Sequence, residues 1–323
     1  MKLVERSWYS KFGITWLLFP LSALFYLVAK YRFYTQRKLQ NQSDKPKVIV
    51  VGNIAVGGTG KTPFTVFLVE HLKKLGLRVA VISRGYGGEV QSKPLLVDEN
   101  VSAEQCGDEP KLIALRCKVP VVVYPKRNES IAFLNNKYSL DVIIADDGLQ
   151  HYQMPRAIEL CIVDASRRFG NKLVLPVGPL REPCSRLKHV DLTIYNGDTC
   201  NIGYTLVVDG VYRVKDQKEI TDFNEPLTLI SAIGNPSRFE KTVDEMNIKV
   251  LGHHIFKDHH NYQDTDFAML TGPLLMTEKD AVKCQAFAKS NWYYLKVSAQ
   301  PTQQLLNKLG QLLNDKGIHN HGI

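Results

Sequence analysis

The chain has 323 residues, enough for two ordinary domains or one large one. Hydrophobic residues make up 44% and charged residues 23%, which excludes a chain dominated by long disorder. The net charge of +9 favours an anionic partner: nucleic acid, a phosphorylated substrate or an acidic bilayer surface. The six cysteines include no CxxC pair, so their spacing matches neither a zinc site nor a small disulfide-rich fold. We expect mostly buried free thiols in a reducing cytosol.

The first informative stretch is apolar. No residue between Lys11 and Lys30 is charged, and residues 14–29 read ITWLLFPLSALFYLVA. As a helix these residues would rise roughly 24 Å, which is shorter than the ~30 Å hydrocarbon core of a bilayer. Pro20 is expected to kink such a helix. Aromatic and basic residues suited to lipid headgroups lie near its ends or directly after it, namely Trp16, Tyr26, Lys30, Tyr31, Arg32, Tyr34, Arg37 and Lys38.

Three interpretations of this stretch compete. A secretory signal lacks a convincing small-residue cleavage site. A buried core helix explains the apolar run but not its flanks. A membrane-inserted or interfacial anchor explains both, and we favour it. Residues 1–40 are therefore predicted to form a membrane-associated helix, and the polar run Gln40–Lys47 is predicted to join it to the rest of the chain.

Short β-branched runs alternate with helical patterns over residues 41–203. Continuous apolar strands separated by helices indicate a parallel sheet covered on both faces, so the fold class is α/β. The predicted strands are Val48–Val51, Arg78–Ile82, Val119–Tyr124, Val142–Ala145, Leu160–Val163 and Leu192–Tyr195.

A hairpin signal follows at Tyr204–Val214. Asp209-Gly210 can supply the positive φ angles of a tight turn, so we predict a two-stranded linker over residues 204–222. The alternation then resumes, which predicts a smaller α/β domain over residues 223–323. Its strands are expected at Leu227–Ile230, Val250–Ile255, Leu274–Met276 and Tyr293–Val297, with a last helix from Pro301.

The strongest motif is a glycine-rich loop between a strand and a helix. It comprises Ala55, Val56, Gly57, Gly58, Thr59, Gly60, Lys61 and Thr62, with Pro63 in the first helical turn. This is the setting of a Walker A phosphate loop. Backbone N–H groups and the helix N-terminus hold the β-phosphate, Lys61 neutralises the β/γ oxygens, and the Thr62 hydroxyl can hold Mg²⁺. The loop predicts a nucleoside triphosphate site.

Acidic residues lie where a metal and a base are needed. Asp146 and Asp147 end an apolar strand in a Walker B arrangement, although an Asp pair can also simply cap a helix. Asp108 and Glu109 precede a helix that is expected to begin at Pro110. Alone they would be helix caps, but beside a phosphate loop they suit a base and a metal ligand.

Three further segments are chemically suggestive but ambiguous on their own. Residues 83–88, SRGYGG, can line a phosphate or a sugar, or simply form a turn. Residues 178–183, GPLREP, hold a charged pair in a rigid loop. Residues 256–262, FKDHHNY, place His259 beside Asp258, which can fix its tautomer and raise its basicity; a solvated histidine loop is the alternative.

The ordered set of motifs resembles the tetraacyldisaccharide 4′-kinase family, the lipid A kinases of Gram-negative bacteria. The resemblance runs from Gly52 to Asp280 through GGTGKTP, SRGYG, GDEP, DDGLQH (146–151), LREP, DH (258–259) and TEKD (277–280), and the apolar N-terminus matches too. It implies a P-loop kinase core and a smaller C-terminal α/β domain joined by a two-stranded linker. It also implies transfer of the ATP γ-phosphate to the 4′-hydroxyl of an acylated glucosamine disaccharide 1-phosphate, at the cytoplasmic face of the inner membrane.

The same resemblance implies roles for individual residues. Asp108 would be the general base, supported by His259, which Asp258 would orient; the neighbouring His260 is the alternative. Thr62, Glu109, Asp146 and Asp147 would surround Mg²⁺, and Gln150, His151, Arg181 and Glu182 would line the site. The partners implied are ATP, the lipid substrate and a membrane surface, with no obligate protein partner.

Two other functions are weighed against a kinase. A nucleotide-driven switch would usually carry Asn-Lys-x-Asp if it bound GTP, and the sequence lacks this motif. A nucleic-acid binder would suit the pI of about 9.1, but no binding module is recognisable and the basic residues are spread along the chain. We therefore predict no nucleic-acid partner.

Overall fold

The computed structural model describes residues 3–10, 13–38, 46–89, 91–223 and 225–319. The chain forms two compact units: Met1–Arg84, Lys126–Thr205 and Ala299–Ile323 make up unit 1, and Gly85–Pro125 and Leu206–Ser298 make up unit 2. Both units are discontinuous in sequence, unlike the contiguous predicted domains, because Gly85–Pro125 groups with the later part of the chain. Most of the predicted junction at residues 40–47 lies outside the described residues.

Unit 1 is built on a parallel sheet, which confirms the predicted α/β class. Its strand order is β7-β6-β1-β5-β2, and all neighbouring pairs are parallel. The strands are β1 (Lys47–Gly52), β2 (Val79–Ser83), β5 (Val142–Asp146), β6 (Ile158–Asp164) and β7 (Leu192–Asn196). Their apolar side chains are almost wholly buried, as expected for a sheet covered on both faces. The helices of this unit include α3 (Lys61–Lys74), α6 (Arg127–Lys137) and α9 (Gln303–Asp315), with the 3₁₀ turn η2 (Cys184–His189).

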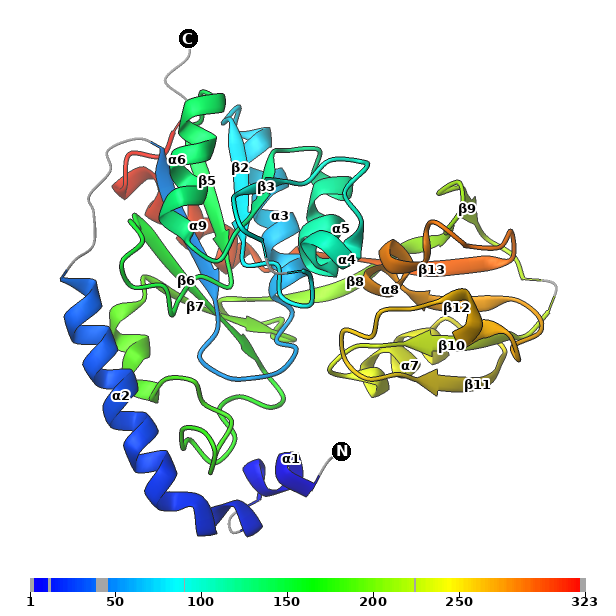
Figure 1. The fold of residues 1–323 in the computed structure, drawn as a ribbon, viewed down its shortest axis with the longest axis horizontal. Coiled ribbons are helices and arrows are strands. Elements are labelled where there is room, and N and C mark those ends of the chain that lie inside the picture. Colours follow the sequence, from blue (N-terminus) through cyan, green and yellow to red (C-terminus); the bar gives the residue numbers. More distant parts are fainter. Residues whose placement is uncertain (1–2, 11–12, 39–45, 90, 224, 320–323) are drawn as a thin grey trace. The chain divides into compact units, whose positions relative to one another are not determined.

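The N-terminal segment of unit 1 contains α1 (Leu3–Trp8), the 3₁₀ turn η1 (Ile14–Leu18) and the long helix α2 (Phe19–Arg37), drawn in blue in Figure 1. Pro20 lies in the first turn of α2, where a missing N–H costs nothing. Pro20 therefore does not bend a continuous helix as expected. The chain instead changes from a 3₁₀ turn to an α-helix just before it. One stripe of this segment is buried, at Thr15, Ser22 and Phe33, while large apolar side chains elsewhere on it are exposed.

Unit 2 is a second, smaller α/β body (Figure 1). Its parallel strands β10 (Leu227–Ser231), β11 (Val250–Ile255), β12 (Leu274–Thr277) and β13 (Trp292–Pro301) follow the order β11-β10-β12-β13. Two apolar clusters, centred on Trp292 and Phe239, form its core. The segment 85–125 adds the antiparallel pair β3 (Leu95–Leu96) and β4 (Val121–Val123) with α4 (Ala103–Cys106) and α5 (Asp108–Cys117). Helix α5 packs against α8 (Glu278–Cys284), and α7 (Pro236–Glu245) and η3 (Asp264–Phe267) complete the unit.

The hairpin turn predicted at Asp209-Gly210 is wrong. Strand β8 runs unbroken from Gly203 to Arg213, and the turn follows it, so that β9 (Glu219–Ile220) pairs back antiparallel to Val211 and Tyr212. Gly210 has a φ of 147° and continues the strand. The Asp209 carboxylate accepts a hydrogen bond of 2.9 Å from Arg116 instead of closing a turn. β8 and β13 each begin in one unit and end in the other.

The cysteines are free thiols, as expected. Four are buried and Cys184 is half-buried, whereas Cys200 is exposed.

Candidate active site

The glycine-rich loop of unit 1 lies between β1 and α3, in the setting that the sequence predicts. Gly57 and Gly60 have φ angles of 102° and 87°, values that side chains other than glycine rarely adopt. Lys61 is the first residue of α3, so its ammonium lies beside the helix N-terminus. Backbone amides, a helix N-terminus and a lysine in this order make a binding site for a polyphosphate.

Two side chains hold this loop from outside. Asn196 at the end of β7 donates to the Thr59 carbonyl at 3.0 Å, and the Tyr204 hydroxyl donates to the Gly60 carbonyl at 2.7 Å. A Cβ atom on Gly60 would lie 2.2 Å from the Asn196 amide nitrogen, so only glycine fits there. Both residues are buried. Sequence reasoning missed them, because neither belongs to a motif.

Asp146 and Asp147 lie at the carboxyl end of β5 in different environments. Asp146 is almost fully buried and accepts a hydrogen bond from Thr65 of α3 at 3.1 Å. Asp147 is partly exposed, 3.5 Å from the Lys61 ammonium and 3.0 Å from the Arg181 guanidinium. Burial would raise the pKa of Asp147, but Lys61 and Arg181 outweigh burial and lower the pKa to about 2. Asp147 is therefore a permanent carboxylate beside the phosphate loop.

The other predicted lining residues of unit 1 lie behind this carboxylate. The Gln150 amide donates to the Asn53 carbonyl at 2.9 Å and to Glu182 at 2.6 Å. Glu182 is 2% exposed, so it supports its neighbours and does not present a free surface. Burial, followed by the nearby charge of Arg127, lowers the pKa of His151 to about 4, which keeps the imidazole neutral.

Arg127, at the start of α6, is a charged residue of this region that the motifs did not reveal. Its Nη2 atom donates to the Asp146 carbonyl at 2.9 Å. The side chain is buried, and its Nε and Nη1 atoms have no hydrogen-bond partner among the described residues. Burial lowers its pKa to about 10, so the guanidinium stays charged at neutral pH. A buried cation beside two carboxylates suits a site that receives further negative charge.

Unit 2 holds the second group of predicted site residues. Asp108 is the first residue of α5, two residues earlier than the predicted start at Pro110, because Gly107 with a φ of 90° ends α4 and begins α5 directly. Asp108 is 4% exposed. Its carboxylate lies 3.1 and 3.2 Å from the Nδ1 atom of His259.

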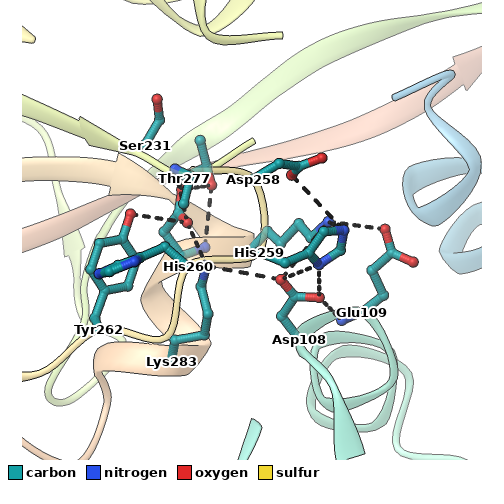
Figure 2. A network of polar contacts seen from close by, with 12 residues as sticks. Asp108, Glu109, Ser231, Asp258, His259, His260, Tyr262, Thr277 and Lys283 are labelled. Carbon is teal, nitrogen blue, oxygen red and sulfur yellow. Dashed lines mark hydrogen bonds and ion pairs between the residues drawn. The ribbon is translucent and has the colours of Figure 1, made fainter. Parts of the chain in front are cut away.

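The two neighbouring histidines contact different groups. Figure 2 shows His259 directed at Asp108, whereas His260 points toward Tyr262. His260 contacts Asp266 at 2.9 Å and stacks on Phe256. His259 has a φ of 59°, an uncommon conformation for a non-glycine residue and one often found at functional sites.

The predicted orienting contact from Asp258 is long in this structure. Its carboxylate lies 3.9 Å from the Nε2 atom of His259, beyond hydrogen-bonding distance. The Lys279 ammonium lies 3.4 Å from the same Nε2 atom and 3.1 Å from Glu109. A lysine can only donate, so Nε2 accepts and Nδ1–H donates to Asp108. Lys279 belongs to the TEKD motif, to which the sequence alone assigned no role.

The Asp108 carboxylate is held in its charged form. Burial would raise its pKa, but the His259 hydrogen bond and the charges of Lys279 and Lys283 together lower it. Lys283 contacts Asp108 at 3.9 Å and Asp280 at 2.9 Å. A buried, ionised carboxylate with one face on an imidazole is suited to accept a proton from an alcohol.

The residues predicted to hold Mg²⁺ offer oxygen ligands, which this ion prefers. Thr62, Asp146 and Asp147 belong to unit 1, and they lie at a helix N-terminus and a strand end, as in other phosphate-loop sites. Glu109 belongs to unit 2 and is paired with Lys279. Within the described ranges no three His, Cys, Asp or Glu side chains converge as a preformed ligand set. The donor chemistry fits a Mg²⁺ ion that arrives with nucleotide.

Comparison with known proteins gives the family. The model of the tetraacyldisaccharide-1-P 4′-kinase family matches residues 14–314. The chain belongs to this family. It is 49% identical to the tetraacyldisaccharide 4′-kinase of Pseudoalteromonas translucida, over 99% of both chains. It is 46% identical to the enzyme of the same name from Aeromonas hydrophila, over 95% of both.

A solved structure supports the same conclusion. The "apo" form of LpxK from Aquifex aeolicus, crystallised in complex with ATP, matches this family member with a TM-score of 0.77. The two sequences are 27% identical, and the match covers 94% of this chain and 99% of the other. The predicted mixed α/β fold with its mostly parallel sheet is thus confirmed by a solved relative.

Proposed function

We propose that the chain transfers the γ-phosphate of ATP to the 4′-hydroxyl of a tetraacylated glucosamine disaccharide 1-phosphate, in lipid A biosynthesis. Membership of the kinase family and the ATP complex of the Aquifex aeolicus relative support this function. The observation that carries it is the pairing of Asp108 with His259. A phosphate loop serves any nucleotide hydrolase or switch, whereas a buried carboxylate held by an imidazole serves transfer to an alcohol.

The family resemblance, together with the geometry inside each unit, supports a division of labour. Lys61 and the loop amides bind the β- and γ-phosphates, and Thr62 with Asp147 or Asp146 would hold the Mg²⁺ that ATP brings. A bound Mg²⁺ would neutralise phosphate charge. Asp108 accepts the proton of the sugar hydroxyl, and His259 holds the carboxylate in place through its Nδ1–H. Phosphoryl transfer needs mainly positioning and charge neutralisation, which these side chains provide.

The proposed function is tested by phosphate transfer to lipid. Full-length protein in detergent micelles is incubated with ATP labelled at the γ-phosphate, Mg²⁺ and the tetraacyldisaccharide 1-phosphate, and the lipid is extracted and counted. We expect label in the lipid, and ATP consumption that depends on the acceptor. ATP turnover that is the same with and without acceptor, together with unlabelled lipid, would instead identify a nucleotide-driven switch.

The N-terminal segment is proposed to lie in the surface of the inner membrane, on the cytoplasmic side where ATP is available. Ile14–Arg37 is long and apolar enough to cross a bilayer, and only 11% of its most apolar 18-residue stretch is buried, which argues against a core helix. One stripe of the segment nevertheless packs on unit 1, through Ser22 and Phe33. A helix that is covered by protein on one side and exposes leucines on the other suits the interface better than the bilayer centre.

Replacing two exposed leucines, Leu24→Gln and Leu27→Gln, is expected to weaken membrane binding by about tenfold or more, because each side chain loses its transfer into lipid. These side chains are 58% and 62% exposed. The measurement is co-sedimentation with vesicles of phosphatidylethanolamine and phosphatidylglycerol. Met269→Gln, at a 93% exposed position in unit 2, is the matched control. Unchanged sedimentation of the double variant would place the attachment elsewhere.

A further inference from the structure

The connection between β6 and β7 contacts the N-terminal segment on one side and the phosphate loop on the other. We name residues 171–182 of this connection the bridging loop (green, beside α1 and α2 in Figure 1). Two internal hydrogen bonds make it compact: Leu175 N–H to the Leu180 carbonyl at 2.8 Å, and Leu180 N–H to the Leu173 carbonyl at 3.2 Å. All of its contacts described below lie within unit 1.

Three side chains of the N-terminal segment, one from each of three successive elements, bind the side of the bridging loop that faces them. Trp8 of α1 donates its indole N–H to the Pro176 carbonyl at 2.9 Å. Thr15 of η1 donates to the Val177 carbonyl at 3.0 Å, and Ser22 of α2 donates to the Val174 carbonyl at 2.7 Å. Two of these carbonyls also accept a bond from within the loop, Val177 from the Asn171 amide at 2.9 Å and Val174 from Gly178 N–H at 3.1 Å. The N-terminal segment supplies the second donor to each, which ties the buried loop to the segment.

These hydroxyls are buried, although they lie in an apolar stretch. Thr15 is 2% exposed and Ser22 is 4% exposed, whereas their neighbour Leu17 is 83% exposed. The Thr15 hydroxyl also lies 2.5 Å from the Ser7 hydroxyl. Because the Thr15 proton goes to Val177, Ser7 is the donor in that contact. If the segment served only as an anchor, it would not need buried polar side chains at these positions, because lipid favours apolar ones.

The other side of the bridging loop contacts the start of the phosphate loop. Val56 N–H donates to the Pro179 carbonyl at 2.8 Å, and Arg181 N–H donates to the Ile54 carbonyl at 2.7 Å. These two bonds flank an antiparallel bridge between Ala55 and Leu180. The next side chain of the same loop, Arg181, contacts Asp147. The path from α2 to the nucleotide site is therefore only a few residues long.

We infer that Trp8, Thr15 and Ser22 are positioning residues of the nucleotide site: they fix the bridging loop, and the bridging loop fixes residues 54–56 and Arg181. The inner stripe of the N-terminal segment thus shapes the ATP site, while its outer face binds lipid. This inference rests on the proposed nucleotide site. It adds that ATP binding depends on residues of the membrane-associated segment that touch neither nucleotide nor lipid.

The test separates the two faces of the segment. Thr15→Val combined with Ser22→Ala removes two buried donors, and we expect the dissociation constant for a fluorescent ATP analogue to rise about tenfold. Full-length protein in detergent micelles is used, and vesicle sedimentation should stay normal. Thr35→Val is the matched control on α2, because among the described residues the Thr35 hydroxyl bonds to the Tyr31 carbonyl of its own helix and to no part of the bridging loop.

A second measurement, amide hydrogen exchange, reports on the contact between the bridging loop and the phosphate loop. In the double variant the Val56 and Arg181 amides should exchange hydrogen for deuterium faster than in wild type, and in Thr35→Val they should not. Should the double variant fail to fold, Trp8→Phe removes a single donor, and the same two measurements are made on it. An unchanged ATP affinity in a folded variant overturns the inference, whatever happens to its thermal stability. If wild type itself does not bind the analogue, the proposed function fails instead.

Discussion

Lys61→Ala is expected to reduce phosphate transfer to lipid by at least about 10²–10³-fold in kcat/KM, the usual loss when one group that stabilises transition-state charge is removed. In this structure the Lys61 ammonium lies 3.5 Å from Asp147 at the N-terminus of α3. Without this cation the carboxylate would repel the incoming phosphates. The transfer assay described above, with ATP concentration varied, measures the effect.

Lys73→Ala is the matched control for this variant. Lys73 lies on the same helix, is partly exposed and pairs with Glu70, so its removal tests loss of a lysine from α3 without loss of charge at the phosphate loop. The control is expected to retain near-normal activity, because exposed ion pairs contribute little. Substantial transfer by Lys61→Ala would show that the triphosphate binds somewhere other than the glycine-rich loop.

The phosphate loop of unit 1 could be predicted from sequence because it is local. A strand, a glycine-rich turn and a helix lie within residues 47–74, and each property of the motif follows from neighbouring residues. Asp147 was predictable for the same reason, since the carboxyl end of an apolar parallel strand is where ligands collect. Its partner Arg181 comes from a connection 34 residues later and was assigned only through the resemblance.

Contacts over long sequence separations could not be predicted in this way. Lys279 contacts His259 and Glu109 because α8 packs on α5, and no spacing pattern in the sequence predicts that packing. The turn predicted at Asp209-Gly210 failed because a bond from Arg116 holds Asp209 in an extended strand. A tertiary contact therefore outweighed the local preference of Asp-Gly for a turn.

The N-terminal segment was predicted only in part from its sequence. Its apolar composition predicted an anchor, but the structure divides the segment into a stripe that packs on unit 1 and a face that does not. Thr15 and Ser22, seven residues apart in an apolar run, were the available signal, because two helical turns place them on one side. Which carbonyls they contact depends on the bridging loop, more than 150 residues away.

Asp108→Asn is expected to lower kcat by about 10²–10⁴, the usual contribution of a general base, while ATP binding is retained. The asparagine keeps the shape and the hydrogen bond to His259 but cannot take a proton. Single-turnover transfer with saturating ATP measures the chemical step directly. Glu104→Gln, an exposed acid on the neighbouring helix α4, is the control and should be near normal.

The neighbouring histidines sharpen this experiment. His259→Gln should lose less activity than Asp108→Asn if the imidazole only holds the carboxylate, and His260→Gln should lose least, because His260 contacts Asp266 instead. The lowered pKa of Asp108 is compatible with the proposed role as a base, because the transition state of phosphoryl transfer is loose and the hydroxyl proton leaves late. A near-normal kcat for Asp108→Asn would mean that the alcohol needs no base here, and that this cluster of unit 2 serves only to position the sugar.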